Sequence, residues 1–299
     1  MRQRSSSLGQ AYDVSEMFSK EQSLEMFEKL CRIRYFELNV KEAYDQKKIK
    51  APIYLSIGQE AVPAALSTVY KPDSKFTQHR GHGYYIAYGG DLEALADELL
   101  HKPTGCAKGM AGSASIHSPK IGMIGHDGHM GSEVPIGVGY LFGRNFKTGL
   151  NEKGLIVVGD AAAEEDYVLA TYGYASKKNI QCLFVCEDNN LSILTKVEAR
   201  RNWKTSNVAR SFGLESIDIT DDPWIIMYYA KEFDKKLPAF MNIHVARAVW
   251  HAGTGNDGPP EWDRFSLIRE ELERLELKKE SDEIEAREKN EISELWKRL

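Results

Sequence analysis

Two short polar turns in the middle of the chain contain residue types that could hold a metal-bound diphosphate. Gly159-Asp160 ends a short apolar run, Leu155–Val158, and Glu187-Asp188-Asn189-Asn190 ends a second one, Cys182–Cys186. A carboxylate and an amide oxygen, together with a backbone carbonyl and phosphate oxygens, form the octahedral oxygen shell that Mg²⁺ prefers. Asp160 and Asn189 therefore predict a diphosphate carried on magnesium.

A β–α–β unit would bring these two turns together. The apolar runs have the length of buried strands, and Ala162–Ser176 between them suits a helix. In such a unit the strands are parallel, so both turns leave the sheet at the same edge, where the helix N-terminus points its free N–H groups. The pattern also fits an ordinary nucleotide-binding half or a plain parallel-sheet core, so the flanking motifs have to decide.

The segment Thr77–Tyr85 is a second place where an anion could bind. It sets Arg80 beside His79 and His82 in a glycine-containing stretch. An arginine side chain forks onto phosphate, and glycine lets the backbone approach a ligand closely. The alternative is a surface loop that contains histidines by chance.

A glycine-rich turn, Gly125–Gly139, leads into a helix whose small residues allow close packing. His126 and His129 lie in this turn and could be considered as metal ligands. No cysteine or third histidine stands near them in the sequence, so the segment gives little support for a zinc site.

The composition is typical of a globular protein and gives no electrostatic footprint for nucleic acid. The chain has 299 residues, 42% hydrophobic content and a formal net charge of -5. We expect no membrane segment, because no apolar run approaches the length of about eighteen residues that spans a bilayer. Cys31, Cys106, Cys182 and Cys186 lack zinc or redox spacing, which favours buried thiols in a reducing compartment and a cytoplasmic location.

The flanking segments divide the chain into a flexible start, 1–22, a main domain, 23–262, and a helical tail, 263–299. The first dozen residues are basic and Ser-rich; they faintly resemble an organelle transit peptide, but we favour a disordered start because an apolar signal core is lacking. From Ser23, apolar residues at helical spacing predict a long helix. The apolar face of the tail predicts either a solvated helix or a surface for a partner subunit.

Several separated motifs resemble the alpha subunits of the thiamine-diphosphate-dependent 2-oxo-acid dehydrogenase E1 component. Gly159-Asp160 followed by Asn189 resembles the thiamine-diphosphate motif, in which GDG is followed at a similar interval by NN. The resemblance extends from about Ile57 to His251 and implies the thiamine-diphosphate-binding fold, an α/β fold with a parallel sheet flanked by helices. The other motifs that carry it, in family order, are GQEA at Gly58–Ala61, the Thr77–Tyr85 segment, TGCAKGMAGSASIH at Thr104–His117, the Gly125–Gly139 turn, and Arg247 with His251.

The resemblance also implies roles for individual residues. Asp160, Asn189 and the Leu191 carbonyl would bind Mg²⁺. Ile193 would hold the cofactor in a bent conformation, and His82 and His251 would orient the substrate and move protons. The other residues implied to bind thiamine diphosphate are His79, Arg80, Gly128, Met130, Gly159, Ala161, Ala162 and Arg247, with His251 at the mouth of the site.

Four positions depart from the family pattern. Ala161 replaces the last glycine of GDG, which is a mild change if its φ angle is negative. Glu164 replaces a frequent asparagine and would repel a diphosphate if it faced one. His79 stands where an aromatic residue often precedes the diphosphate-binding arginine. Asp188 replaces the first asparagine of NN, so Asn190 is an alternative to Asn189 as the metal ligand.

The resemblance implies a subunit that decarboxylates a 2-oxo acid and passes the product to an acceptor, with a lipoyl domain as one candidate. The glutamate that activates the cofactor in this family belongs to a pyrimidine-binding domain, for which the chain has no room. A beta subunit in an α2β2 heterotetramer is therefore implied. A split transketolase-like ketol transferase and a catalytically silent, partner-binding subunit are the alternatives; Ala161 and the acidic run Glu164–Asp166 motivate the silent subunit.

Overall fold

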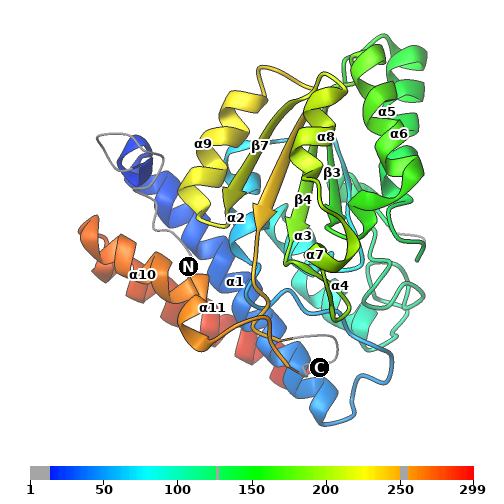
Figure 1. Cartoon of the computed structure of the whole chain (residues 1–299). Helices are drawn as coiled ribbons and strands as arrows, with labels where there is room; N and C mark the ends of the chain where they lie inside the picture. Colours follow the sequence, from blue (N-terminus) through cyan, green and yellow to red (C-terminus); the bar gives the residue numbers. More distant parts are fainter. Residues whose placement is uncertain (1–13, 126–127, 250–254) are drawn as a thin grey trace.

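The computed structural model describes residues 14–125, 128–249 and 255–299. A six-stranded parallel sheet with strand order β2-β1-β3-β4-β8-β7 forms its centre (Figure 1). An antiparallel hairpin of two short strands, β5 and β6, follows β4. The strands are β1 (Ser74–Phe76), β2 (Met123–Ile124), β3 (Gly154–Gly159), β4 (Cys182–Asp188), β5 (Leu191–Ser192), β6 (Thr195–Lys196), β7 (Glu215–Thr220) and β8 (Ala239–His244).

The side chains of β3 alternate between two hydrophobic clusters, one on each face of the sheet. Leu155 and Val157 belong to the larger cluster, and Ile156 and Val158 belong to the smaller one. All four are fully buried, as expected for a parallel strand that is covered on both faces. The sheet is therefore the middle layer of a three-layer α/β domain.

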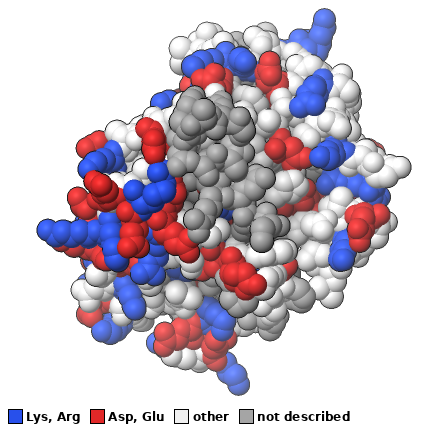
Figure 2. Space-filling view, turned by 60° about the vertical axis from the view of Figure 1, so that its left-hand side comes forward, with Lys and Arg blue, Asp and Glu red and all other residues white. Residues whose placement is uncertain are grey.

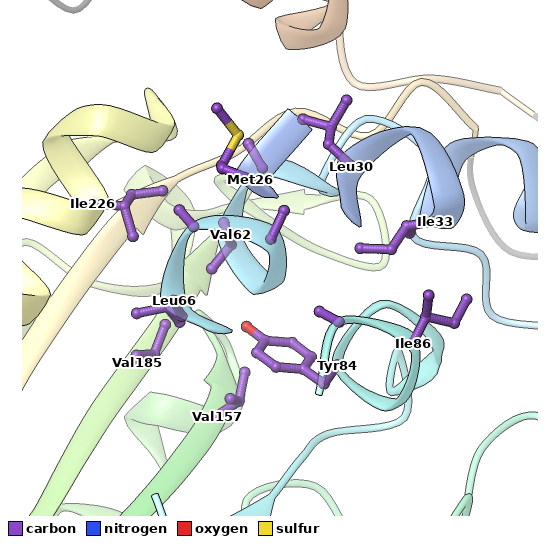
Figure 3. Packing of buried hydrophobic residues seen from close by; sticks show 14 of the residues in the cluster. Met26, Leu30, Ile33, Val62, Leu66, Tyr84, Ile86, Val157, Val185 and Ile226 are labelled. Carbon is purple, nitrogen blue, oxygen red and sulfur yellow. The ribbon is translucent and has the colours of Figure 1, made fainter. Parts of the chain in front are cut away.

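The larger cluster is covered mainly by helices from the first third and the end of the chain. In Figure 3, Met26 of α1 and Val62 of α2 lie above the sheet residues Val157 and Val185, with Tyr84 of α3 beside them. The helices that contribute buried residues to this cluster are α1 (Lys20–Asp45), α2 (Ala61–Val69), α3 (His82–Ala87), α4 (Leu92–Leu99), α9 (Pro223–Phe233), α10 (Arg264–Arg274) and α11 (Lys278–Arg298).

The smaller cluster lies on the opposite face, under α5 (Glu133–Thr148), α6 (Asp166–Lys178) and α8 (Thr205–Ser211). Figure 1 shows α5 and α6 side by side across the sheet from α1 and α11. Within the described residues, the remaining helical elements are the four-residue α7 (Val197–Arg200) and the 3₁₀ turns η1 (Val14–Met17), η2 (Pro119–Ile121), η3 (Ala162–Glu164) and η5 (Pro260–Trp262).

The predicted β–α–β unit is present, but its helix begins later than predicted. A 3₁₀ turn, η3, occupies Ala162–Glu164, and α6 starts at Asp166. Glu165 between them has an extended backbone, with φ -65° and ψ 141°, which separates the turn from the helix. The prediction of one continuous helix from Ala162 was wrong, because the pattern of apolar residues does not distinguish a 3₁₀ turn from the first turn of an α-helix.

The start of the chain is ordered further toward the N-terminus than predicted. Helix α1 begins at Lys20, with Ser19 and Gln22 forming a capping box. Before it, Val14 is fully buried in the larger cluster. The described residues of the predicted flexible start are therefore part of the folded domain; residues 1–13 lie outside the described part.

The C-terminal tail folds back against α1. Ile268, Leu272 and Ile292 are buried in the larger cluster. Arg32 of α1 forms a two-pronged ion pair with Glu288 of α11, with distances of 2.7 Å from Nε to Oε2 and 2.9 Å from Nη2 to Oε1. Neither predicted alternative describes this apolar face, because the chain's own first helix covers it.

The surface and the cysteines add little that is specific. Lys and Arg side chains lie among Asp and Glu side chains on the face shown in Figure 2. Across the described ranges, none of the helices combines the length and the apolar character needed to cross a bilayer. All four cysteines are free thiols, and Cys31, Cys182 and Cys186 are buried.

Polar side chains on β7 and β8 form a small network beside Asp188 at the end of β4. His244 Nε2 lies 2.6 Å from Asp218 Oδ1, which also accepts a hydrogen bond of 2.9 Å from Asn242 Nδ2. Burial opposes the ionisation of Asp218, but the bonds from His244 and Asn242 outweigh it and lower its pKa to about 2. The same Asp218 bond raises the pKa of His244 above its ordinary value.

We expect this pair to stabilise the fold only within a pH window. The raised histidine pKa adds stability that is complete below about pH 6.5 and is lost as the pH rises through the folded value. The lowered aspartate pKa adds stability above about pH 4 that is lost as the pH falls toward 2. A double-mutant cycle with Asp218→Asn and His244→Gln, followed by urea unfolding, should give a coupling of about 0.5 kcal/mol at about pH 5.5 and nearly zero at about pH 9. A coupling that grows with pH would contradict this interpretation.

Candidate functional site

A pocket of about 340 Å³ opens at the carboxyl ends of β3 and β4. This is the edge of the sheet that the sequence predicted. Nearly all of the predicted site residues line it: His79, Arg80, Gly128, Met130, Gly159, Asp160, Ala161, Ala162, Asn189, Leu191, Ile193 and Arg247. His82 is not among the lining residues, and His251 lies outside the described residues. The fold thus gathers residues from five separate segments, although their individual roles stay predictions.

A larger hollow of about 700 Å³ lies elsewhere, between Ser74, His117, Met123 and Tyr140. Its described lining residues include no Asp, Glu, Lys or Arg. The smaller pocket is the better candidate site, because it combines carboxyl, guanidinium and amide groups from different strand ends.

Asp160 lies directly after β3, and its side chain is almost completely buried. Its Oδ2 atom accepts a bond of 2.5 Å from Arg200 Nη2, and the same nitrogen lies 3.0 Å from Glu164 Oε1. Burial raises the pKa of Asp160 to about 6 in spite of the bond from Arg200. The carboxylate predicted to bind a metal ion is thus held by a guanidinium group from α7.

Two departures from the family pattern are harmless in this structure. Ala161 has φ -74°, in the right-handed helical region, so its Cβ causes no backbone strain. The Glu164 carboxylate faces Arg200 and Arg201, at 3.0 Å and 3.3 Å, and is not part of the pocket lining. The predicted repulsion between Glu164 and a diphosphate therefore does not arise.

The two candidate asparagines take different positions. Asn189 lines the pocket, and its Nδ2 donates to Asp257 Oδ2 at 3.0 Å. Asn190 has a left-handed backbone with φ 63°, and its Oδ1 accepts a bond from the Val197 N–H. The preceding Asp188 is also turned to the sheet edge, where its Oδ2 accepts from Asn242 at 3.1 Å. Of the two asparagines, only Asn189 lines the pocket, and there it presents its amide nitrogen to a carboxylate.

Two buried arginines lie at the pocket and could bind an anion. Arg80 donates to the Leu55 carbonyl at 2.6 Å, and burial together with the positive charge of Arg247 lowers its pKa to about 10. Arg247 forms a two-pronged ion pair with Asp257, with both distances 2.8 Å. Burial opposes the ionisation of Asp257, yet the Arg247 bonds keep its pKa below the ordinary value.

Glu187 is a site residue that was not predicted. It occupies β4 opposite Gly159, is 4% exposed and lines the pocket. Its Oε2 accepts from Gln78 Nε2 at 2.6 Å and its Oε1 from the Tyr84 hydroxyl at 3.0 Å. Burial raises the pKa of Glu187 to about 7, against the lowering effect of these two bonds. An acidic residue at the end of an otherwise apolar strand was the available signal.

His82 has a different role from the predicted one. The side chain is fully buried, with Nδ1 2.6 Å from Glu37 Oε1 and Nε2 2.9 Å from Ser113 Oγ. Both ring nitrogens are therefore engaged within the core, and the ring is not placed to touch a substrate. The sequence prediction of a substrate-orienting His82 is corrected to a buried connection between α1, α3 and the segment that contains Ser113.

The remaining histidines give no metal site in the described ranges. The ring of His79 packs edge-on against Tyr54, with a centroid distance of 5.0 Å. His129 packs against Tyr167 at 5.7 Å. Among the described residues, no group of three or more His, Cys, Asp or Glu side chains could hold a metal ion. His126, Asp127 and His251 lie outside the described residues, so the role of His251 stays a prediction and the zinc alternative at His126 and His129 stays untested.

The hairpin β5–β6 forms the outer rim of the pocket. Ile193 at its tip lines the pocket but is 77% exposed, and its backbone has φ 54°. A β-branched residue rarely adopts this left-handed conformation. Arg200 holds the hairpin, because its Nη1 donates to the Thr195 carbonyl at 2.6 Å.

Comparisons with known proteins show the family and the fold of the chain. The model of the dehydrogenase E1 component family matches residues 28–238. The mitochondrial pyruvate dehydrogenase E1 component subunit alpha of Chaetomium thermophilum is 32% identical over 219 residues, which are 73% of this chain and 52% of the relative. That of Saccharomyces cerevisiae is 29% identical over 226 residues, 75% of this chain and 52% of the relative. The chain spans about half the length of the curated relatives it matches.

Solved structures with the same fold include transketolases. One from Campylobacter jejuni superposes with a TM-score of 0.59 at 17% identity, covering 91% of this chain and 48% of the transketolase. An R525L variant from Pichia stipitis gives 0.58 at 14%, covering 91% and 47%. At this identity the likeness shows the fold alone, and it confirms the predicted thiamine-diphosphate-binding fold. The family match confirms the predicted resemblance: the chain belongs to the dehydrogenase E1 component family.

Proposed function

We propose that this chain is the alpha subunit of a thiamine-diphosphate-dependent enzyme that decarboxylates a 2-oxo acid and transfers the product to an acceptor. The observation that carries the proposal is the pocket at the carboxyl ends of β3 and β4. It gathers Asp160, Asn189, Arg80 and Arg247 from four separate segments. Ligands of open α/β sheets bind at this edge.

The residues of the pocket fit a diphosphate cofactor. Arg80 and Arg247 are buried and would neutralise the diphosphate, with Asn189 beside them. Gln59 points to a further part of the ligand that carries a hydrogen-bond donor, because it lines the pocket, is 4% exposed and has an Oε1 atom without a hydrogen-bond partner in the described structure. A buried acceptor of this kind is costly unless a ligand supplies the missing donor.

Thiamine diphosphate, when bound, would supply the carbon nucleophile that attacks the 2-oxo acid. The contribution of this chain would be to bind and orient the cofactor. Glu187 would hold a proton near neutral pH at its Oε atoms, between Gln78 and Tyr84. Gly128, Met130 and Ile193 would shape the wall of the pocket.

The metal is a separate part of the proposal. Asp160, Asn189 and the Leu191 carbonyl are the proposed Mg²⁺ donors, and all three residues line the pocket. In the structure Asp160 is bonded to Arg200, and the Asn189 amide nitrogen faces Asp257. Asp160 is therefore not yet free for a metal ion, and Mg²⁺ would have to displace Arg200.

The partners and location are also proposed. The curated relatives are named as alpha subunits, and this chain spans about half of their length. We infer a beta subunit that carries the pyrimidine-binding domain in an α2β2 heterotetramer, with a lipoyl domain as a candidate acceptor. Free, mostly buried cysteines support a reducing compartment such as the cytoplasm, whereas the curated relatives are named as mitochondrial.

A catalytically silent subunit is the second candidate. One specific observation favours it: Arg200 and Asp257 already bond the residues that a metal and a diphosphate would need. In that case the chain would keep the fold and bind a partner without binding the cofactor.

Calorimetric titration of Mg²⁺ with thiamine diphosphate into the chain copurified with its beta partner separates the two candidates. We expect binding to the wild-type complex and at least a tenfold loss in Asp160→Ala, because that variant lacks the central carboxylate. The matched control is Asp166→Ala, which removes an exposed acid at the start of α6 and should bind like the wild type. Absence of binding to the wild-type complex would favour the silent subunit.

A further inference from the structure

The pocket contains two internal ion pairs whose partners come from outside the sequence motifs. Asp160 is bonded to Arg200 of α7, and Arg247 is bonded to Asp257, which follows β8. Each pair joins a predicted cofactor-binding residue to a group of opposite charge. The positions next to Asp160 and Arg247 are therefore already filled by the chain's own charges.

Arg200 occupies the place of a cation. Its Nη2 contacts both Asp160 Oδ2 at 2.5 Å and Glu164 Oε1 at 3.0 Å, and its Nε contacts Glu164 at 3.2 Å. The side chain is 14% exposed. Because Glu164 receives two of these contacts, Arg200 can release Asp160 and still keep a carboxylate partner. This arrangement suits an exchange between a guanidinium and a metal ion.

Asp257 occupies the place of an anion. Its Oδ2 accepts from the Arg247 backbone N–H at 2.8 Å, from Arg247 Nε at 2.8 Å and from Asn189 Nδ2 at 3.0 Å. Its Oδ1 accepts from Arg247 Nη2 at 2.8 Å. Arginine presents the same fork to carboxylates and to phosphates. A diphosphate would therefore compete with Asp257 for Arg247 and for Asn189.

We propose that Arg200 and Asp257 are internal counterions that fill the cation and anion positions of the pocket in the free chain, and that a divalent cation and a diphosphate bind by displacing them. This inference rests on the proposed function for its choice of ligands. Release of Arg200 would also free the β5–β6 hairpin, which Arg200 holds through the Thr195 carbonyl. Cofactor binding and the position of Ile193 would then be coupled.

The displacement of Arg200 by a divalent cation is tested with Mn²⁺ as the probe. Its binding to the full chain is measured by electron paramagnetic resonance. Arg200→Gln should raise the Mn²⁺ affinity about tenfold over the wild type, because Asp160 is then free of its guanidinium partner. Lys196→Gln is the matched control: it removes the same charge from a 64% exposed lysine near Arg200 and should change the affinity less than twofold. Equal Mn²⁺ affinity in all three proteins, or no measurable binding in any, would overturn the inference.

The displacement of Asp257 by a diphosphate is tested with inorganic diphosphate as the probe. Its binding is measured by calorimetry. Asp257→Asn should raise the diphosphate affinity about tenfold, because the neutral amide competes less well for Arg247. Glu261→Gln, an exposed acid in η5, controls for the change in net charge. Equal diphosphate affinity in the Asp257 and Glu261 variants would contradict the role of Asp257.

Hydrogen exchange of residues 191–201 provides a second readout that needs no ligand. The backbone amides of this segment should exchange faster in Arg200→Gln than in Lys196→Gln. Equal exchange rates would argue that the Arg200 contact with Thr195 does not stabilise the hairpin. Should Arg200→Gln lose its circular dichroism signal, Arg200→Lys gives an intermediate case: it keeps the charge but not the fork, so it should raise the Mn²⁺ affinity less than tenfold and still speed the exchange of residues 191–201. If the affinities change as expected while the complex never binds thiamine diphosphate, the inference stands and the proposed function fails. Cofactor binding without these affinity changes gives the reverse result.

Discussion

Replacing Glu98 by alanine is expected to destabilise the fold by about 4 kcal/mol and to disorder the segment 101–117. Glu98 is fully buried at the end of α4, and four backbone N–H groups of the following segment donate to its carboxylate. Oε2 accepts from Ala107 and Gly109, both at 2.8 Å, and Oε1 accepts from Ala111 at 2.7 Å and Gly112 at 3.1 Å. Alanine leaves these four donors, two of them buried and two partly buried, without their acceptor.

The effect should reach the candidate site. Ser113, next to the last of these donors, accepts from the Tyr54 N–H at 2.9 Å and contacts His82. Both Tyr54 and Ala114 line the pocket. Loss of Glu98 should therefore loosen one wall of the pocket, and thiamine diphosphate binding should weaken together with the free energy of unfolding.

Urea unfolding and hydrogen exchange measure both consequences. Glu98→Gln should lose about half as much stability, because an amide keeps one acceptor oxygen and turns a donor toward the other two N–H groups. Glu93→Ala removes an exposed glutamate from the same helix and should cost less than about 1 kcal/mol. A Glu98→Ala protein with wild-type exchange over 101–117 would show that the segment is held by other contacts.

The centre of the fold was predictable because its signals are local. The runs Leu155–Val158 and Cys182–Cys186 are apolar, short and bounded by polar turns, and they became β3 and β4 with small changes at their ends. Parallel strands place their following turns at one edge, so Asp160 and Asn189 could be assigned to one pocket from their positions in the sequence. The order of the motifs then added Arg80 and Arg247.

The partners of these residues were not predictable. Arg200 and Asp257 belong to segments without a recognisable motif, and a charged residue in such a segment is ordinarily a solvated one. The role of Glu98 was not predictable either. Leu95 and Leu99 account for the apolar pattern of its helix, so the sequence gives no sign that Glu98 is buried. Only the three-dimensional arrangement shows which backbone donors and which charges each of them contacts.

His82 and the tail show two further limits of sequence reasoning. A histidine near an arginine and glycines suggests chemistry, yet the burial that places His82 against Glu37 and Ser113 comes from α1 and from the segment after α4. The tail has a clear apolar stripe, but a stripe does not say which surface will cover it. In this chain the cover is α1, which is distant in sequence.

Replacing Gly58 by alanine is the second change with a large expected effect, about 4 kcal/mol of stability and the displacement of Arg247. Gly58 has φ 96°, and a methyl group at this position would lie 2.4 Å from the Ala246 carbonyl oxygen and 2.6 Å from the Ala248 nitrogen. These are backbone atoms on either side of Arg247, and the Ala248 N–H donates to the Ile57 carbonyl at 2.8 Å. The new methyl group must therefore push the backbone of Arg247 away from the pocket.

Gly89→Ala is the control that separates two contributions to the loss of stability in Gly58→Ala: the steric clash of the new methyl group and the strain of the left-handed backbone. Gly89 has a similar φ of 87°, but no atom lies within 4 Å of the place that its new methyl group would take. Its substitution should cost only the strain of a left-handed backbone, about 1 kcal/mol. Urea unfolding of both variants, with diphosphate titration beside it, gives the comparison: Gly58→Ala should lose about 3 kcal/mol more than Gly89→Ala and should bind diphosphate more weakly. Equal losses in the two variants would mean that the strand end after β8 yields to the methyl group, and that Arg247 is not held in place by the turn at Gly58.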